Sequence, residues 1–389
     1  AMQPGSLFIM CSTVDPNVSV QFEQRLAALG LLYLDAPISG GAAKAASGEM
    51  TMMTSGTPAA YAKAGTTADT PNPPGGDYGA RNGNLTGVVA ESSAMLSFIK
   101  VQPPITPDII ARAITNIAVM AAQQGVTYTH EAATGAIAGV AEVDLLHRVF
   151  AQSGFPLRGS MSLWGERFGD FTAAGIVPGS GDDRLRSQTI KWVSDGSNQG
   201  YTGFMRENYL GRDTRGEANF SQTELEAHFA ATVAAGWPIM CHANGDAAID
   251  MVMAAFAATA KLPTWNAAKR HRVEHSSLLH DEHIAAMAAL GVTPSFLMNH
   301  VRLWGKVMRD EILGPERADL LDRYASAVKA GIRASFHCDF SVSPLAPLNY
   351  IATAAARTMA DGGEVLNAAE RVPVAQAIKG ATIDAAWMR

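Results

Sequence analysis

The chain has few of the features that mark secreted, membrane-spanning or nucleic-acid-binding proteins. Its 389 residues include three cysteines (Cys11, Cys241 and Cys338), too few for a disulfide framework and typical of a reducing, cytoplasmic compartment. The net charge of -6 gives no electrostatic reason to bind nucleic acid or an anionic membrane. No apolar run approaches the roughly 20 residues that span a bilayer, and no basic segment followed by an apolar core marks a signal peptide. With 48% hydrophobic and 17% charged residues, the sequence predicts a folded globular protein.

An alanine-rich helical segment, a glycine and a short apolar run follow one another repeatedly along the chain. Glycine adopts the left-handed conformation that ends a helix at little cost, so each copy predicts a helix followed by a strand. Repeated units of this kind predict an α/β fold with a mainly parallel sheet. The glycines of the five copies are Gly30, Gly125, Gly236, Gly291 and Gly331.

Two histidines follow short apolar runs on either side of a helical pattern. Residues 237–241 lead to His242, a helical pattern covers 246–260, and residues 271–274 lead to His275. In a parallel barrel the carboxyl ends of neighbouring strands share one rim, so the two imidazoles would lie side by side. Neutral imidazoles placed in this way are good ligands for zinc. The alternative is that both are ordinary hydrogen-bonded histidines near strand ends.

Residues 1–63 predict a strand, a helix over about 17–29 and a second strand. The segments CSTVDP, DAPISGGAAKAASGEMTMMTSG and PAAYAKA resemble part of the nucleotide-binding domain of β-hydroxyacid dehydrogenases, with Ser39, Gly40 and Gly41 matching the substrate-binding motif of that family. The family's glycine fingerprint and its catalytic helix are absent. Without a glycine turn at a helix N-terminus there is no cradle for a pyrophosphate. We therefore expect no NAD and no dehydrogenase activity.

The character of the sequence changes near residue 64. Residues 64–91 are rich in proline and glycine and predict loops with a hairpin around Asn82-Gly83. From residue 64 to Arg389 the chain resembles the amidohydrolase superfamily, specifically the amidohydrolase-3 group of metal-dependent hydrolases. The motifs that carry this resemblance are DTPNPPGG with GNLTGVVAE, GVTYTHEAA, IKWVSDGS, CHANGDAA, HRVEHSS and FHCDFSVSPLAPL. It implies a (β/α)8 TIM barrel, with strand ends near His130, Trp164, Lys191, His242, His275, Asn299 and Asp339.

Two parts of the amidohydrolase pattern are missing. No His-x-His pair exists for a first barrel strand, and the sequence lacks the strands of a small β-sandwich that would follow GATIDAAWMR. The chain therefore looks like a join of two gene fragments that encodes an incomplete barrel. A vacant strand position would expose unpaired backbone on both neighbours, so we expect the N-terminal βαβ fragment to replace the first strand through residues 6–13. The barrel end that the sandwich would cover suggests a homodimer.

The amidohydrolase resemblance also implies a set of site residues. Lys191, His242, His275 and Asp339 would bind metal, with Lys191 carboxylated, and Asp339 and Lys191 would be catalytic. A metal lowers the pKa of water from about 15.7 towards 7, and Asp339 would move the proton to the leaving group. A lysine in an apolar strand is costly unless it is paired or modified, so pairing of Lys191 with Asp195 or Glu166 is the alternative.

The missing His-x-His pair bears on the number of metal ions. Its absence removes two ligands of one metal, whereas Lys191, His242 and His275 remain as an open three-ligand site. We expect one divalent ion, zinc, and leave open a weak second ion completed by His130, His337, Cys11 or water. His337 lies two residues before Asp339, so the two side chains share a strand face. This placement makes His337 a substrate contact, together with His130 and Trp164, although core packing is the alternative for Trp164.

These features predict a metal-dependent hydrolase that attacks an amide, N-acyl, N-formyl or ester bond of a small molecule with activated water. One alternative is a catalytically impaired fusion protein with residual metal binding, and another is a promiscuous esterase with an unmetallated site. Serine hydrolysis through Ser160, Ser162 or Ser197 is disfavoured, because none lies in a Gly-x-Ser-x-Gly elbow.

Overall fold

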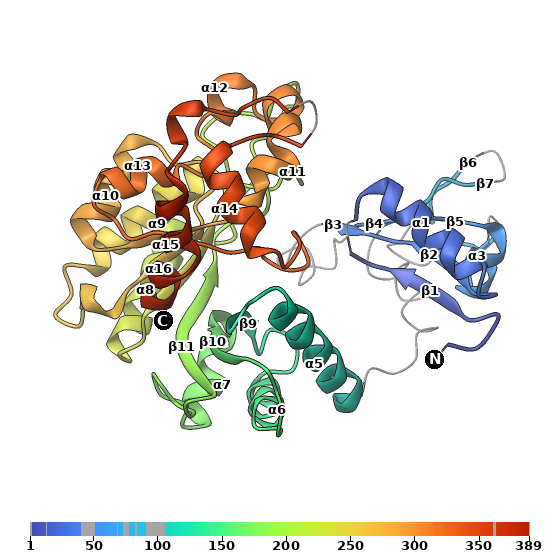
Figure 1. The fold of residues 1–389 in the computed structure, drawn as a ribbon, viewed down its shortest axis with the longest axis horizontal. Coiled ribbons are helices and arrows are strands. Elements are labelled where there is room, and N and C mark those ends of the chain that lie inside the picture. The colour runs from blue at the N-terminus through green and yellow to red at the C-terminus, as the bar shows by residue number, and fades with distance from the viewer. Residues whose placement is uncertain are drawn as a thin grey trace. The chain divides into compact units, whose positions relative to one another are not determined.

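The protein folds into two compact units, Ala1–Ile105 and Thr106–Arg389 (Figure 1). The boundary between the two units falls between residues 105 and 106, later in the chain than the boundary expected at residues 63 and 64. Its cause is a strand pairing in the first unit, where β8 (Val88–Ala90) adds antiparallel to β4 (Thr51–Met53). The computed structural model describes residues 2–12, 14–39, 51–67, 69–72, 78–81, 84–90, 106–360 and 363–388.

The first unit begins with the predicted βαβ element. β1 (Leu7–Met10) and β2 (Leu32–Asp35) pair in parallel on either side of α1 (Pro16–Ala27), and β5 (Ser55–Gly56) adds antiparallel to β2. The hypothesis that residues 6–13 fill the first barrel strand is therefore wrong. In the described residues β1 belongs to this three-stranded sheet, because the short α1 crossover brings β2 alongside and satisfies the backbone of β1 locally.

Two smaller antiparallel pieces complete the first unit. β3 (Ile38–Ser39) joins β4 and β8, and β6 (Ala80–Arg81) pairs antiparallel with β7 (Asn84–Leu85), in agreement with the predicted hairpin. The expected turn residues, Asn82 and Gly83, lie outside the described residues. The motif glycines Gly40 and Gly41 lie outside the described residues. α3 (Pro58–Lys63) follows β5. The core of the unit is small, and its buried members are Leu34, Ala36, Met52, Ala60, Tyr61, Ala64, Tyr78 and Val89.

The second unit is built on one parallel sheet whose strands follow their order in the sequence. The sheet is open in the described residues, with β9 and β15 at its two edges. An incomplete barrel of amidohydrolase type was predicted, and the alternation of strand and helix confirms the α/β class. The strands are β9 (Tyr128–Thr134), β10 (Arg158–Trp164), β11 (Leu185–Val193), β12 (Ile239–Ala243), β13 (Arg272–His275), β14 (Thr293–Phe296) and β15 (Ser335–Phe336).

Helices follow the strands of this sheet, and their ends match the local sequence signals. Gly236 has φ +78° at the end of α8, as the helix-glycine-strand pattern predicts. Ser221 and Glu224 form a capping box at the start of the same helix. No helix in the described residues is long and apolar enough to cross a membrane. The helices are α5 (Pro107–Gln123), α6 (Val140–Phe150), α7 (Phe168–Ala173), α8 (Gln222–Ala234), α9 (Asp246–Thr259), α10 (Asp281–Leu290), α11 (Asn299–Val307), α12 (Pro315–Ala318), α13 (Tyr324–Lys329), α14 (Pro347–Ala356), α15 (Val374–Ala381) and α16 (Ile383–Trp387).

A hydrogen bond across the interior shows that the sheet is curled. His130 on β9 and Arg272 on β13 are separated by three intervening strands, which in a flat sheet would place their backbones about 19 Å apart. Yet Nε2 of His130 lies 2.8 Å from Nη2 of Arg272. The concave face therefore carries polar side chains that meet one another, while alternate residues such as Cys241 and Val273 are buried in the hydrophobic core.

Candidate active site

Five neighbouring strands each deliver an ionisable side chain at or just beyond their carboxyl ends. The structure brings together the two histidines predicted from the sequence, because the ring centroids of His242 and His275 are 4.5 Å apart. The ring of His337 lies 4.9 Å from that of His275. We call this group the rim, and from β11 to β15 it consists of Lys191, His242, His275, His300 and His337, with Asp339 two residues further on.

Lys191 lies in the interior of the second unit, in register with Trp164 on β10 and Met240 on β12. Burial lowers the pKa of its amine, and the carboxylates of Glu274 and Asp339 act in the opposite direction. Asp195 and Glu166, the alternative partners expected from the sequence, are not among the groups that chiefly shift the pKa of Lys191. Trp164, the predicted substrate contact, ends β10 and is half-buried.

Asp195 instead holds the loop that follows β11 against the end of β12. Its carboxylate accepts hydrogen bonds from the amides of Phe204 (3.0 Å), Asn244 (3.0 Å) and Gly245 (2.8 Å). Nε2 of His242 lies 3.2 Å from Asp195 Oδ1 and 2.9 Å from the carbonyl oxygen of Gly196. The side-chain nitrogen of Asn244 lies 3.1 Å from the same Nε2, so three polar neighbours surround this ring nitrogen.

His275 reaches the rim through an unusual backbone conformation. Strict alternation along β13 would place Glu274 and His275 on opposite faces, but His275 has φ +70° and its ring lies against those of His242 and His337. Its Nδ1 is buried and has no hydrogen-bond partner in the described structure. Burial, and then the neighbouring His242, hold the pKa of His275 well below its usual value, so the imidazole is neutral. Strained backbone of this kind is concentrated at functional sites.

His337 and Asp339 follow β15, which ends at Phe336 rather than near Asp339. Nε2 of His337 lies 3.5 Å from Oε1 of Glu274, and burial lowers the pKa of this histidine. Asp339 is exposed and has φ +48°, a second left-handed residue at the rim. A carboxylate that is accessible beside buried imidazoles can exchange protons with a substrate.

Sequence reasoning missed two buried residues of this region. Glu274 pairs with Arg272 (Oε2 to Nε, 2.9 Å), and Arg272 chiefly offsets the effect of burial to bring the pKa of Glu274 to about 2. The alternation of arginine and glutamate in HRVEH was the available signal. His300 was missed because Asn299 was taken as a strand end, whereas β14 ends at Phe296 and Asn299 begins α11.

His130 is held inside the unit by three neighbours. Its Nδ1 lies 2.6 Å from the hydroxyl of Ser160, and its Nε2 lies 2.7 Å from that of Ser162 and 2.8 Å from Arg272. Ser160 and Ser162 are 2% and 0% exposed as residues, so no substrate carbonyl can approach their hydroxyls. This burial argues against a serine nucleophile. The role of His130 as a substrate contact stays a prediction.

The residues present fit a metal only if Lys191 is modified. Among the described residues, no three His, Cys, Asp or Glu side chains are arranged to hold an ion. His242 and His275 offer two neighbouring imidazoles, whereas a protonated lysine cannot be a ligand. Carboxylation of Lys191 would replace the cation with an anionic oxygen donor and complete a three-residue set.

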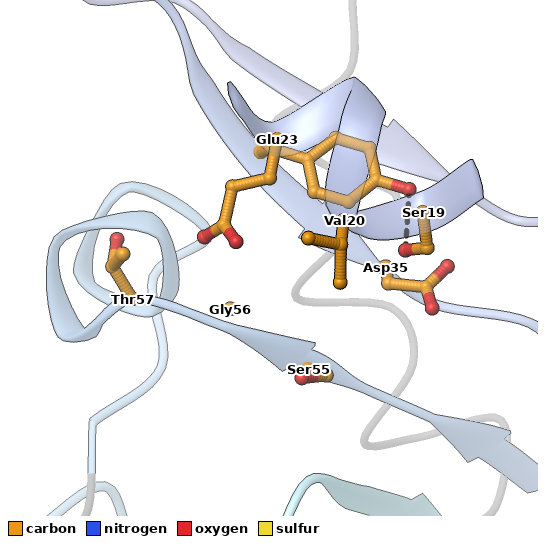
Figure 2. A pocket seen from close by; sticks show the side chains of 8 residues that line it. Ser19, Val20, Glu23, Asp35, Ser55, Gly56 and Thr57 are labelled. Carbon is orange, nitrogen blue, oxygen red and sulfur yellow. Dashed lines mark hydrogen bonds between the residues drawn. The ribbon is translucent and has the colours of Figure 1, made fainter. Parts of the chain in front are cut away.

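Two cavities lie away from the rim. One of about 750 Å³ opens at the amino ends of the strands, with Arg158, Ser187, Pro238 and Arg270 in its lining; this face of a barrel serves stability rather than chemistry. The other, of about 290 Å³, is lined by α1, β2 and β5 in the first unit (Figure 2). Its polar lining consists of Ser19, Glu23, Tyr33, Asp35, Ser55 and Thr57. The two carboxylates would repel a pyrophosphate.

Comparison with known sequences confirms both resemblances. The profile of the amidohydrolase family matches residues 53–389, and that of the NAD binding domain of 6-phosphogluconate dehydrogenase matches residues 1–69. L-threonate dehydrogenase of Cupriavidus necator is 62% identical over 64 residues, which are 16% of this chain and 22% of that protein. Mitochondrial 3-hydroxyisobutyrate dehydrogenase of Rattus norvegicus is 40% identical over 63 residues, 16% and 19% respectively. The chain thus spans about a fifth of the length of these curated relatives.

Two solved structures share the fold. An uncharacterized metal-dependent hydrolase from Pyrococcus horikoshii superposes with a TM-score of 0.68 at 18% identity, covering 94% of this chain and 69% of that chain. Another from Pyrococcus furiosus gives a TM-score of 0.67 at 19% identity, covering 87% and 65%. At this level of identity the likeness establishes the architecture.

Proposed function

Since the chain belongs to the amidohydrolase family over residues 53–389, we propose that it hydrolyses an amide, N-acyl, N-formyl or ester bond of a small molecule. The observation that carries the proposal is the rim, where the imidazoles of His242 and His275 meet edge to face with 4.5 Å between ring centroids. Lys191 and Asp339 act electrostatically on the same group of residues. Parallel barrels place their chemistry at this end of the strands.

We propose that Lys191, His242 and His275 hold one divalent ion, zinc, with Lys191 carboxylated and Asp339 adjoining it. When bound, such an ion polarises a carbonyl and lowers the pKa of water. Asp339 takes a proton from the attacking water and gives it to the leaving nitrogen or oxygen. The carbonyl carbon gains the water oxygen as its bond to that leaving atom breaks. Trp164 and His337 bound the space beside the scissile group.

Elemental analysis of the purified full chain tests this proposal. We expect about one zinc or similar ion per chain in the parent, and a loss of at least about fivefold in Lys191→Ala and His242→Ala, because each removes one of three ligands. Lys261→Ala, in the turn that follows α9, and His147→Ala, on α6, are matched controls outside the rim and should keep the ion. Hydrolysis of a p-nitrophenyl ester and a p-nitroanilide should fall with the metal. A metal-free parent that hydrolyses neither probe would refute the proposal.

A catalytically impaired fusion protein, or an esterase that works without metal, is the second candidate. The observation that favours it is that the unmodified described residues form no three-ligand group. Ester hydrolysis that survives treatment with a chelator, and that is lost in Asp339→Asn, would support the metal-free esterase. Folded protein with neither metal nor hydrolysis would support the impaired fusion.

We further propose that the first unit binds no NAD and that the whole chain acts on a small molecule, without nucleic acid or membrane as partner. The carboxylates of Glu23 and Asp35 in the cavity of that unit support this view, because they disfavour an anionic cofactor. Fluorescence titration with NADH would reveal binding. A homodimer is also proposed, and sedimentation velocity would test it.

A further inference from the structure

His300 is the one rim histidine for which neither the sequence nor the proposed reaction supplies a role. It is the second residue of α11, just beyond β14, and it is 3% exposed. Neither ring nitrogen has a hydrogen-bond partner in the described structure. A buried polar group without a partner costs about 1–3 kcal/mol, and native proteins rarely leave one in this state. This cost calls for a ligand that satisfies the ring.

The surroundings of His300 place it at the rim. The ionisable groups that act on it are His337 and Asp339, and it acts in turn on His275. The backbone at this position is fixed by neighbouring contacts, because the amide of His300 donates to the carbonyl of Leu297 at 2.8 Å. The adjoining side chain of Asn299 donates to the hydroxyl of Ser343 at 3.3 Å. These bonds leave both ring nitrogens of His300 for a bound molecule.

The protonation state of the His300 ring limits which chemical groups can bind to it. Burial lowers the pKa of His300 to about 4, so at neutral pH it carries one N–H donor and one acceptor nitrogen. A metal ion is disfavoured, because the described residues include no group of three His, Cys, Asp or Glu ligands at this place. An oxygen acceptor on an organic molecule remains as the partner for the N–H.

We propose that His300 is a substrate-binding residue, which donates its ring N–H to a carbonyl or carboxylate oxygen of the molecule that enters the rim. This inference rests on the proposed function, in that the rim is taken as the place where substrate binds. It assigns His300 to binding and orientation, while proton transfer stays with Asp339.

Replacement of His300 by leucine separates binding from structure. Leucine fills a similar volume without a polar group, so removing an unpartnered ring should leave the unfolding free energy unchanged or raise it. The KM for ester and amide probes should rise about tenfold or more, as expected for one lost hydrogen bond, while kcat stays within about threefold. His300→Gln keeps an N–H donor and should restore most of the affinity. His147→Leu, a half-buried histidine on α6, is the matched control and should change neither constant.

A binding measurement makes the test independent of turnover. Calorimetric titration of the parent with acetate and with acetamide distinguishes a carboxylate from a neutral carbonyl as the preferred acceptor, and binding of the preferred probe should weaken about tenfold in His300→Leu. Binding that depends on His300 in a parent without hydrolysis would support the inference while the proposed reaction fails. The inference is overturned by equal binding in parent and variant, by no binding of either probe, or by a clear loss of stability in His300→Leu, which would reveal a structural partner such as a buried water.

Discussion

The two units use the same kind of element, a parallel βαβ, to different ends. In the first unit β1 and β2 form an isolated parallel pair flanked by short antiparallel strands. In the second, seven strands run parallel in sequence order, so the carboxyl ends of five neighbours converge. A single βαβ presents at most two strand ends, which is too few for a set of ligands. The difference teaches that repetition of the unit, rather than the unit itself, builds the site.

Polar residues differ between the units in the same way. The first 105 residues contain no histidine, and the cavity of the first unit is lined by carboxylates and hydroxyls. The second unit buries histidines, a lysine and arginines beside one another. Buried ionisable groups are expensive and persist where they are paired or used. This contrast supports the second unit as the place of chemistry, and the following experiments test it.

The largest effect is expected at Arg357, which is fully buried in the second unit. Its guanidinium donates to the carbonyl oxygens of Leu366 (2.7 Å), Leu321 (2.8 Å) and Asp322 (3.1 Å). Arg357→Met should lower the unfolding free energy of this unit by about 4 kcal/mol, because it removes the guanidinium that donates to three buried carbonyls. Of these, the carbonyl of Asp322 keeps the amide of Tyr324 as a donor at 2.8 Å. Hydrogen exchange of peptides within 106–389 measures the loss. Arg25→Met, an exposed residue on α1, should stay within about 0.5 kcal/mol, and equal effects of the two changes would contradict the prediction.

The next effect is expected at Leu34, which is 0% exposed in the small core of the first unit. Leu34→Ala should cost about 3 kcal/mol through lost burial and a cavity. Leu29→Ala is the control, because Leu29 is 67% exposed. Exchange of peptides within 1–39 should rise in the first variant and stay unchanged in the second. An equal rise in hydrogen exchange throughout 106–389 would show that the cores of the two units do not unfold separately.

A change of pH should distinguish the units because only the second contains histidines. Burial lowers the pKa of His271 and of His300 to about 4, whereas an unfolded histidine has a pKa near 6.5. Below pH 6.5 the unfolded state therefore binds more protons than the folded state, and the unfolding free energy falls as the pH drops towards 4. Each ring contributes about 1.4 kcal/mol per pH unit within this window.

Urea unfolding between pH 7 and pH 5 measures this slope, with hydrogen exchange reporting each unit. His300→Leu should reduce the slope of the second unit by about one proton, and His147→Leu should leave it unchanged. The first unit contains no histidine, so protonation of histidine should not lower its unfolding free energy. A slope that is identical in parent and His300→Leu would show that the ring is protonated in the folded protein.

The smallest effects are expected at two helix caps. Ser221→Ala removes the hydroxyl half of the capping box of α8, in which Ser221 Oγ accepts from the Glu224 amide (3.3 Å) and donates to Glu224 Oε2 (2.7 Å), and should cost about 1 kcal/mol. Asp15→Ala removes a single bond from the amide of Asn17 (2.7 Å) at α1 and should cost about 0.5 kcal/mol. Denaturant midpoints give both values. The reverse order would show that α1 depends on its cap more than α8 does.

Local patterns in the sequence were sufficient to locate most elements. The helix-glycine-strand repeat and the hairpin expected around 82–83 depend on residues within a few positions of one another, and both were predicted. The family motifs added the expectation that Lys191, His242, His275 and Asp339 would come together, and the structure places the two imidazoles side by side.

The sequence by itself therefore determined the α/β class and the order of the strands. Only the tertiary structure decided that β1 pairs with β2 rather than with the barrel, that the sheet curls until His130 meets Arg272, and that a left-handed His275 and a buried His300 join the rim. The physical reason is distance along the chain. Propensity and alternation act between neighbours, whereas strand partners, backbone strain and unpartnered polar groups depend on residues that fold against them from far away in the sequence.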